Sequence, residues 1–193
     1  MTCLECSPLD SIMARYGSQL AAIGPKAPIV FRDALNREGR KGRKEIRQAL
    51  VRQTGLRLAV IRRAIDPRTR SASVSSLQYR MDGVGGEISL RYFSPRETRS
   101  GVKHRSPNVP SPVPHAFTKG GSFRTGRKAV RPPVTTGHVW IRKDPSKFPL
   151  HKEKSGVWIP KEMVRGESLD RYRAIAFRLD GTVGKQIARF LPH

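Results

Sequence analysis

The sequence is poor in acidic residues, and it contains no long hydrophobic run. Asp and Glu number 15 against 38 Lys and Arg, which gives a formal net charge of +23 and a pI near 11.3. A positive field of this size attracts polyanions such as DNA, RNA or acidic protein surfaces, but it does not specify a fold. No apolar run approaches the roughly 18 residues that a membrane span requires. The composition therefore favours a virion or ribosomal type of protein that works beside nucleic acid.

Cysteine is also scarce. Cys3 and Cys6 form a single CxxC, and no second pair of ligands accompanies it, since the five histidines are scattered. A structural zinc site needs four ligands, so we expect neither a metal site nor a cofactor. We expect residues 1–12 to form a flexible N-terminus outside the fold.

Enzyme motifs are missing from the sequence. It has no HExxH, no GxSxG and no P-loop. The best carboxylate candidates are Glu167 with Asp170, and Asp144 after a predicted strand, but solvation of the surface explains all three. The sequence therefore predicts a protein that is not an enzyme.

Apolar residues at helical spacing predict four helices. The first covers residues 11–23, and the second begins at Pro28 and continues past Leu50. Two glycines, Gly39 and Gly42, fall on the apolar stripe of this second helix. We expect one long helix with a weak middle, in which the glycines permit close packing between helices or subunits. The third helix covers residues 56–65. The last helical segment covers residues 167–191, and one kinked helix or two short helices would both fit its spacing across Asp180-Gly181.

A period of two residues predicts short strands between the third and last helices. The expected strands are at residues 77–81, 88–92, 101–104, 115–118 and 138–142. Four prolines in residues 107–114 exclude helix and central strand there. The sum is a single α+β domain over residues 13–193, with N-terminal basic helices, a small antiparallel β-sheet with long loops, and a C-terminal helix.

The stretch from Arg37 to Arg63 holds ten Arg or Lys and two Glu in 27 residues. Its cations flank the apolar stripe on both sides, so we expect them to contact DNA or an acidic partner. The candidates in this stretch are Arg37, Arg40, Lys41, Arg43, Lys44 and Arg47.

Residues 44–65 also match a helix-turn-helix, with Gly55 at the turn. The match is common, because any pair of helices joined through a glycine and packed by aliphatic residues satisfies it. The second helix holds mainly Arg and aliphatic residues, with no Asn or Gln to bind base edges. Attraction to phosphates is therefore favoured over recognition of bases, and a DNA-binding protein with this basic hairpin remains the alternative function.

A long basic loop or hairpin is expected at residues 119–137. It contributes further candidate contacts to DNA or to an acidic partner, namely Arg124, Arg127, Lys128 and Arg131. Phe117, Trp140 and Trp158 lie in apolar, strand-like runs. We expect these three aromatic residues, together with Gly39 and Gly42, to serve core or subunit interfaces.

Three stretches of the chain resemble the phage minor tail protein Z family, the tail-completion proteins of long-tailed phages. The first is ALNREGRKGRKEIRQALVRQTGL followed by RLAVIRRAI, which is similar to the family's basic helix, "TGL" and short basic helix. The second is EISLRYFSPRETRSGV at residues 87–102. The third comprises VPHAFTKGG and GHVWIRKDPSKFPL. Together they span most of residues 30–160.

The resemblance implies an α+β structural protein of the virion, located at the head-proximal end of the tail and made in the host cytoplasm. It implies a hexameric ring at the neck that joins head and tail and surrounds genome DNA. The implied neighbours are the tail terminator, the tail tube and the head-closure protein.

Overall fold

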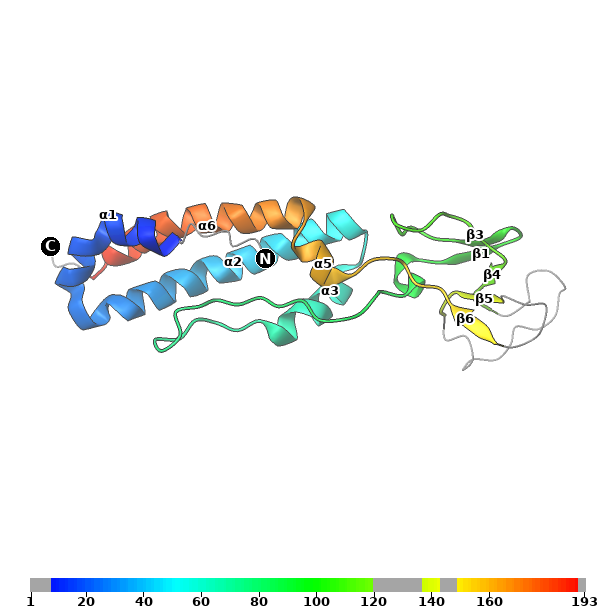
Figure 1. The fold of residues 1–193 in the computed structure, drawn as a ribbon, viewed down its shortest axis with the longest axis horizontal. Coiled ribbons are helices and arrows are strands. Elements are labelled where there is room, and N and C mark those ends of the chain that lie inside the picture. The colour runs from blue at the N-terminus through cyan, green and yellow to red at the C-terminus, as the bar shows by residue number, and fades with distance from the viewer. Residues whose placement is uncertain (1–7, 120–136, 143–148, 191–193) are drawn as a thin grey trace.

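The computed structural model describes residues 8–119, 137–142 and 149–190. The molecule is elongated, with long helices side by side at one end and two small sheets at the other (Figure 1). This arrangement confirms the expected α+β class, with two three-stranded sheets in place of one.

The N-terminal region is helical from Pro8 onward. Helix α1 spans Pro8–Ile23, and a 3-10 turn at Gly24–Lys26 connects it to α2, which spans Ala27–Thr54 without a break. The single long second helix is thus confirmed. Of the N-terminus expected at residues 1–12, residues 8–12 form the first turns of α1, and residues 1–7 lie outside the described residues. Proline is favoured in a first helical turn, which fits a helix that begins at Pro8.

Helix α3 spans Leu58–Ile65 and is followed by a 3-10 turn at Asp66–Arg68. The chain then forms an arm, residues 70–80, that runs along α2 and turns back (Figure 1). Its two limbs are joined by a single bridge between Arg70 and Arg80 and by a turn in which Ser73 donates to Ser76.

The expected strand at residues 77–81 is wrong, because Arg80 makes only that isolated bridge. Tyr79 instead lies against Gly39 of α2. The alternation of apolar and polar residues at 77–81 reflects a half-buried segment. Its apolar side packs on helices, and the segment does not pair with a strand of either described sheet.

The expected strand at residues 88–92 is also wrong. Leu90–Phe93 form a 3-10 helix, η3, and the Ser89 side chain caps it by accepting from the Arg91 backbone N–H. Leu90 and Phe93 are both buried. Their spacing of three residues suits a 3-10 turn, where side chains at i and i+3 share one side.

The first sheet is an antiparallel meander of β1 (Arg96–Thr98), β2 (Gly101–Lys103) and β3 (Val113–Pro114). The proline-rich segment therefore supplies an edge strand, as expected for residues that lack N–H donors. The second sheet is β4 (Ala116–Phe117), β5 (Trp140–Arg142) and β6 (Leu150–Lys152), also antiparallel. The expected strands at 101–104, 115–118 and 138–142 are confirmed as β2, β4 and β5.

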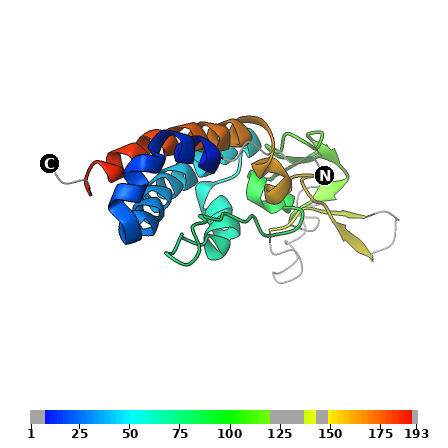
Figure 2. The same cartoon turned by 60° about the vertical axis from the view of Figure 1, so that its left-hand side comes forward.

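The C-terminal region returns to the helices. Helix α5 (Ile159–Met163) leads into α6 (Gly166–Ile187), which continues through Asp180-Gly181 and packs along α2. Figure 2 shows α1 lying against the far part of α6 at the end of the molecule opposite the sheets.

Two hydrophobic cores result. The larger core joins the second half of α2 and α3 to residues of both sheets, and includes Leu50, Ile61, Phe93 and Val139. The smaller core joins α1, the first half of α2 and the end of α6. Helix α2 contributes to both cores, so it connects the two ends of the molecule.

Candidate nucleic-acid interface

One face of α2 carries exposed cations that have no partner. Arg37, Arg40 and Lys44 recur at intervals of three and four residues, which places them on one face of the helix. All three are exposed, and none makes an ion pair or hydrogen bond within the described residues. We name these three residues the α2 row. Exposed cations in a row along a rigid helix suit contact with successive phosphates.

The other predicted cations of α2 have different surroundings. Lys41 donates to the buried carboxylate of Glu38 at 2.9 Å, so its charge is partly balanced. Arg43 is half-buried. Arg47 is only 12% exposed and pairs with Asp66, which ties the middle of α2 to the segment after α3. Arg47 therefore holds the fold together and is poorly placed to contact a ligand.

The α2–α3 connection has the expected hairpin form. Gly55 adopts a left-handed conformation with φ of +71° and caps α2 through the N–H bond to Val51. Arg57, Arg62 and Arg63 are exposed beside it. These residues extend the cationic surface of the helical end, and among the described residues none of the three has an ion pair.

The glycines of α2 accommodate side chains of this same chain. A Cβ at Gly39 would overlap the ring of Tyr79 from the arm, and a Cβ at Gly42 would overlap the side chain of Ile175 from α6. Both glycines are buried. The close packing expected at these positions is thus occupied within the subunit.

Opposite charges balance the side of α2 that faces α6. Arg178 of α6 binds both carboxylate oxygens of Glu45, at 3.0 and 2.9 Å, and lies 3.7 Å from Glu38. Burial pushes the pKa of Glu38 upward, but hydrogen bonds from Lys41 and Thr182 and the charges of Lys41 and Arg178 outweigh it. The pKa of Glu38 is therefore lowered, and the residue stays ionised between the helices.

The predicted aromatic residues lie near cations. Phe117 of β4 has the Arg142 guanidinium 5.3 Å from its ring centroid, and Trp158 has the Lys161 ammonium at 4.8 Å. Trp158 remains 38% exposed, while Trp140 is half-buried in β5. Arg124, Arg127, Lys128 and Arg131 lie outside the described residues.

The last described residues before position 120, Thr118 and Lys119, are held by an acidic residue that the sequence did not single out. Glu97 of β1 accepts from the N–H and hydroxyl of Thr118, both at 3.0 Å, and from the N–H of Lys119 at 2.9 Å. Because β4 and β5 pair antiparallel, the segment between them joins two adjacent strands.

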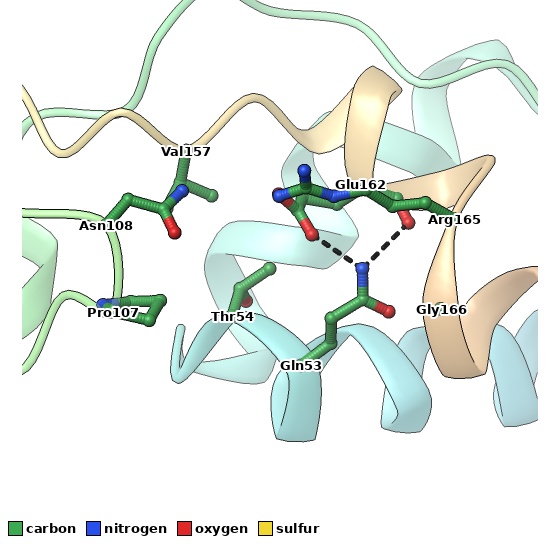
Figure 3. A pocket seen from close by; sticks show the side chains of 8 residues that line it. All are labelled: Gln53, Thr54, Pro107, Asn108, Val157, Glu162, Arg165 and Gly166. Atoms are coloured by element: carbon green, nitrogen blue, oxygen red, sulfur yellow. Dashed lines mark hydrogen bonds and ion pairs between the residues drawn. The ribbon is translucent and has the colours of Figure 1, made fainter.

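A pocket of about 230 Å³ lies where α2, the α5–α6 connection and the proline-rich segment meet (Figure 3). In it Gln53 donates to Glu162 at the carboxylate (2.5 Å) and at the carbonyl (3.2 Å). Arg165 binds the other carboxylate oxygen, and this bond raises the pKa of Arg165. With its oxygens already bonded to neighbours, this carboxylate holds α5 against the end of α2 and is poorly suited to acid–base chemistry.

A second polar cluster lies on the sheet end. His138 Nδ1 lies 2.8 Å from Ser89 Oγ, and His138 Nε2 lies 3.2 Å from Lys152 Nζ. A nucleophilic serine needs a histidine base supported by an acid on its far nitrogen. Here the far nitrogen meets a cation, which disfavours proton uptake, so this pair is unsuited to nucleophilic catalysis. Nothing in the local sequence signalled the cluster, because its members are far apart in the chain.

The fold and site define a basic α+β protein with an uncompensated cationic helix face. Comparisons with protein-family models, curated proteins and solved structures find no match to this chain. Within the described part of the chain, no three His, Cys, Asp or Glu side chains group as metal ligands. No helix of that part is both long and apolar enough to cross a membrane.

Proposed function

We propose that this chain is a structural virion protein at the head-proximal end of a phage tail, where it completes the tail, joins it to the head and contacts genome DNA. The observation that carries the DNA contact is the α2 row, three exposed cations on one helix that have no acidic partner in the described part of the chain. The phage assignment rests on the order and spacing of the three family-like stretches in the sequence. The proposed location at the neck and the proposed ring of about six subunits rest on the same three stretches.

Contact without base recognition fits the chemistry of these residues. Lys and Arg bind phosphates whatever the sequence, and DNA that passes through a ring presents every sequence in turn. The absence of Asn and Gln from α3 also fits, because those side chains are the usual partners of adenine.

The DNA contact is tested by removing the α2 row. The variant Arg37→Gln, Arg40→Gln, Lys44→Gln should bind duplex DNA more weakly, and the slope of log affinity against log salt should fall by about 2 to 3. The matched control is Lys26→Gln, Lys185→Gln, Arg189→Gln, which removes the same charge at the other end of the helices. Equal loss in both variants would show that bulk charge, and not the α2 row, attracts DNA.

The proposed ring is tested by measuring the molar mass of the complex that the chain forms. Light scattering of the chain with portal and tail proteins should give a complex that holds several copies, near six. A chain that stays monomeric in that mixture, yet binds short duplex DNA tightly at about 0.2 M salt, would contradict the neck assignment.

The α2–α3 hairpin supports a second candidate, a DNA-binding protein with a helix-turn-helix-like motif. Its observation is the left-handed Gly55 between two helices, with Arg62 and Arg63 exposed on the second. A defined operator bound with roughly 10³-fold preference over random DNA would favour this candidate, because backbone contact alone cannot supply that ratio.

A further inference from the structure

Three nitrogen-bearing side chains gather at the second sheet, and we name them the cation cluster: Arg91, His138 and Lys152. They come from η3, from the residues before β5, and from β6. Lys152 Nζ lies 3.2 Å from His138 Nε2. Arg91 Nε lies 3.7 Å from the position that a Cβ would take at Gly137, the residue next to His138.

Hydrogen bonds orient the imidazole at the centre of the cluster. Lys152 can donate to Nε2 only if that nitrogen is unprotonated, so the ring proton sits on Nδ1 and is donated to Ser89 Oγ. Ser89 Oγ also accepts from the Arg91 backbone N–H at 3.4 Å. The imidazole is therefore held in one orientation while Arg91 and Lys152 reach solvent.

Among the residues that the structure describes, no anion is paired with the cation cluster. Neither Arg91 nor Lys152 makes an ion pair within the described residues. Burial lowers the pKa of His138, and the charges of Lys152 and Arg91 lower it further. No carboxylate contributes to the shift, so the charged groups that act on this histidine are all cations. Like charges held together by a sheet repel each other, and a bound anion relieves that repulsion.

From this geometry we propose that Arg91, His138 and Lys152 form a binding site for a phosphate group. Arg91 supplies a guanidinium fork and Lys152 an ammonium beside His138, which suits the several oxygens of a tetrahedral anion. His138 Nε2 adds a third donor once it is protonated and turns from Lys152 to the anion. The source is a phosphodiester of DNA if the function proposed above holds, and in that respect the inference rests on it. The site would give DNA a second contact, at the end of the molecule opposite α1.

Phosphate binding is coupled to proton uptake. An anion beside the imidazole favours its protonated form, so the pKa of His138 is higher in the complex than in the free protein. The complex therefore holds more protons between these two pKa values. Affinity should therefore rise as the pH falls from the pKa of His138 in the complex to its pKa in the free protein. The pKa in the free protein is the lower of the two and lies below the ordinary histidine value.

The test follows the imidazole resonances of His138 by NMR across pH 4.5–8 in phosphate-free buffer. Inorganic phosphate and a short duplex DNA are added separately. Both should raise the pKa of His138, and Arg91→Gln with Lys152→Gln should abolish that rise. The matched control is Arg96→Gln with Lys103→Gln, a cross-strand pair of exposed cations on the first sheet, which should leave the rise intact.

The outcomes separate the site from the function. An unchanged His138 titration with both ligands, or full binding by the Arg91 and Lys152 variant, would overturn the site. A rise with phosphate alone would support the site and count against the DNA contact. Loss of DNA binding in the α2 row variant, with the His138 response to phosphate kept, would support both proposals. His138→Gln serves as a second variant, since it should remove the pH dependence of duplex DNA binding while Arg91 and Lys152 remain. DNA is the ligand for this comparison because a phosphodiester keeps its charge across pH 4.5–8, whereas inorganic phosphate titrates within that range.

Discussion

At the scale of single residues, the glycines of the long helices differ in whether a larger side chain would fit in their place. Gly39 and Gly42 lie under Tyr79 and Ile175, while Gly181 of α6 has open space where a Cβ would be. A glycine inside a helix costs about 1 kcal/mol relative to alanine. The first two sites accept this cost because a side chain from another segment occupies the space.

We predict that Gly39→Ala lowers the free energy of unfolding by about 1 to 3 kcal/mol, because the new methyl group displaces the Tyr79 ring. The matched control, Gly181→Ala, should raise it by about 0.5 to 1 kcal/mol through helix propensity alone. Urea unfolding followed by circular dichroism measures both. Stabilisation by both substitutions would contradict the close packing at Gly39.

The sequence predicted the charge of each residue but not its partner. Arg40 and Arg47 looked equivalent in the sequence, yet Arg40 is exposed and unpaired while Arg47 is bonded to Asp66. The difference depends on where the segment after α3 packs. No local pattern encodes that position, so the α2 row could be separated from structural cations only in three dimensions.

At the scale of elements, the arm at residues 70–80 is hydrogen-bonded to α2 through Asn36, in addition to the packing of Tyr79 on Gly39. Asn36 donates to the carbonyl of Ala72 and accepts from its N–H, both at 2.9 Å. Ala72 is buried, while Val74 and Leu77 on the arm are largely exposed. An asparagine amide can replace the pairing of a neighbouring strand in this way, which explains why the arm is held without a sheet.

We predict that Asn36→Ala loosens the arm. Loss of both hydrogen bonds should cost about 1 to 3 kcal/mol, which corresponds to exchange of the Ala72 amide that is faster by about 5- to 150-fold. Hydrogen–deuterium exchange measures this at single residues. Gln48→Ala is the control, because Gln48 is exposed on the same helix and has no hydrogen-bond partner among the described residues. Unchanged exchange at Ala72 in the Asn36 variant would contradict the anchor.

Element types were predictable where an apolar stripe matched a buried face. The stripe of α2 is buried by α6 and the arm, and the stripe of α6 by α2 and α1, so helical spacing identified both helices. The predicted strands at 77–81 and 88–92 were wrong for a physical reason. A period of two shows only that alternate side chains are covered, and here Tyr79 is covered by α2 without a neighbouring strand.

At the scale of the whole molecule, the helical end and the sheets are joined near the end of α2. Ser106 donates to the carbonyl of Ser155 at 3.0 Å, and Ser168 donates to the carbonyl of Glu162 at 2.5 Å. The Ser106 bond links the segments that follow β2 and β6, whereas the Ser168 and Gln53 bonds to Glu162 tie α2, α5 and α6 together. Figure 3 shows the Gln53–Glu162 bonds.

We predict that Glu162→Ala weakens the contact between α5 and the end of α2. The substitution leaves Gln53 without its carboxylate partner and should lower the free energy of unfolding by about 1 to 3 kcal/mol. The urea midpoint should fall with an unchanged m-value, since the surface exposed on unfolding stays the same. Glu153→Ala is the control, because the Glu153 side chain has no partner among the described residues. Equal midpoints for the two variants would contradict a stabilising contact at Glu162.

The sequence alone determined the net charge, the positions of the long helices and three of the six strands, because charge and periodicity are local properties. Tertiary structure decided which cations remain unpaired and which glycines are covered. It also brought Ser89, Arg91, His138 and Lys152 together from distant parts of the chain. Ion pairs, close packing and clusters of like charge depend on long-range contacts, so only the folded chain determines them.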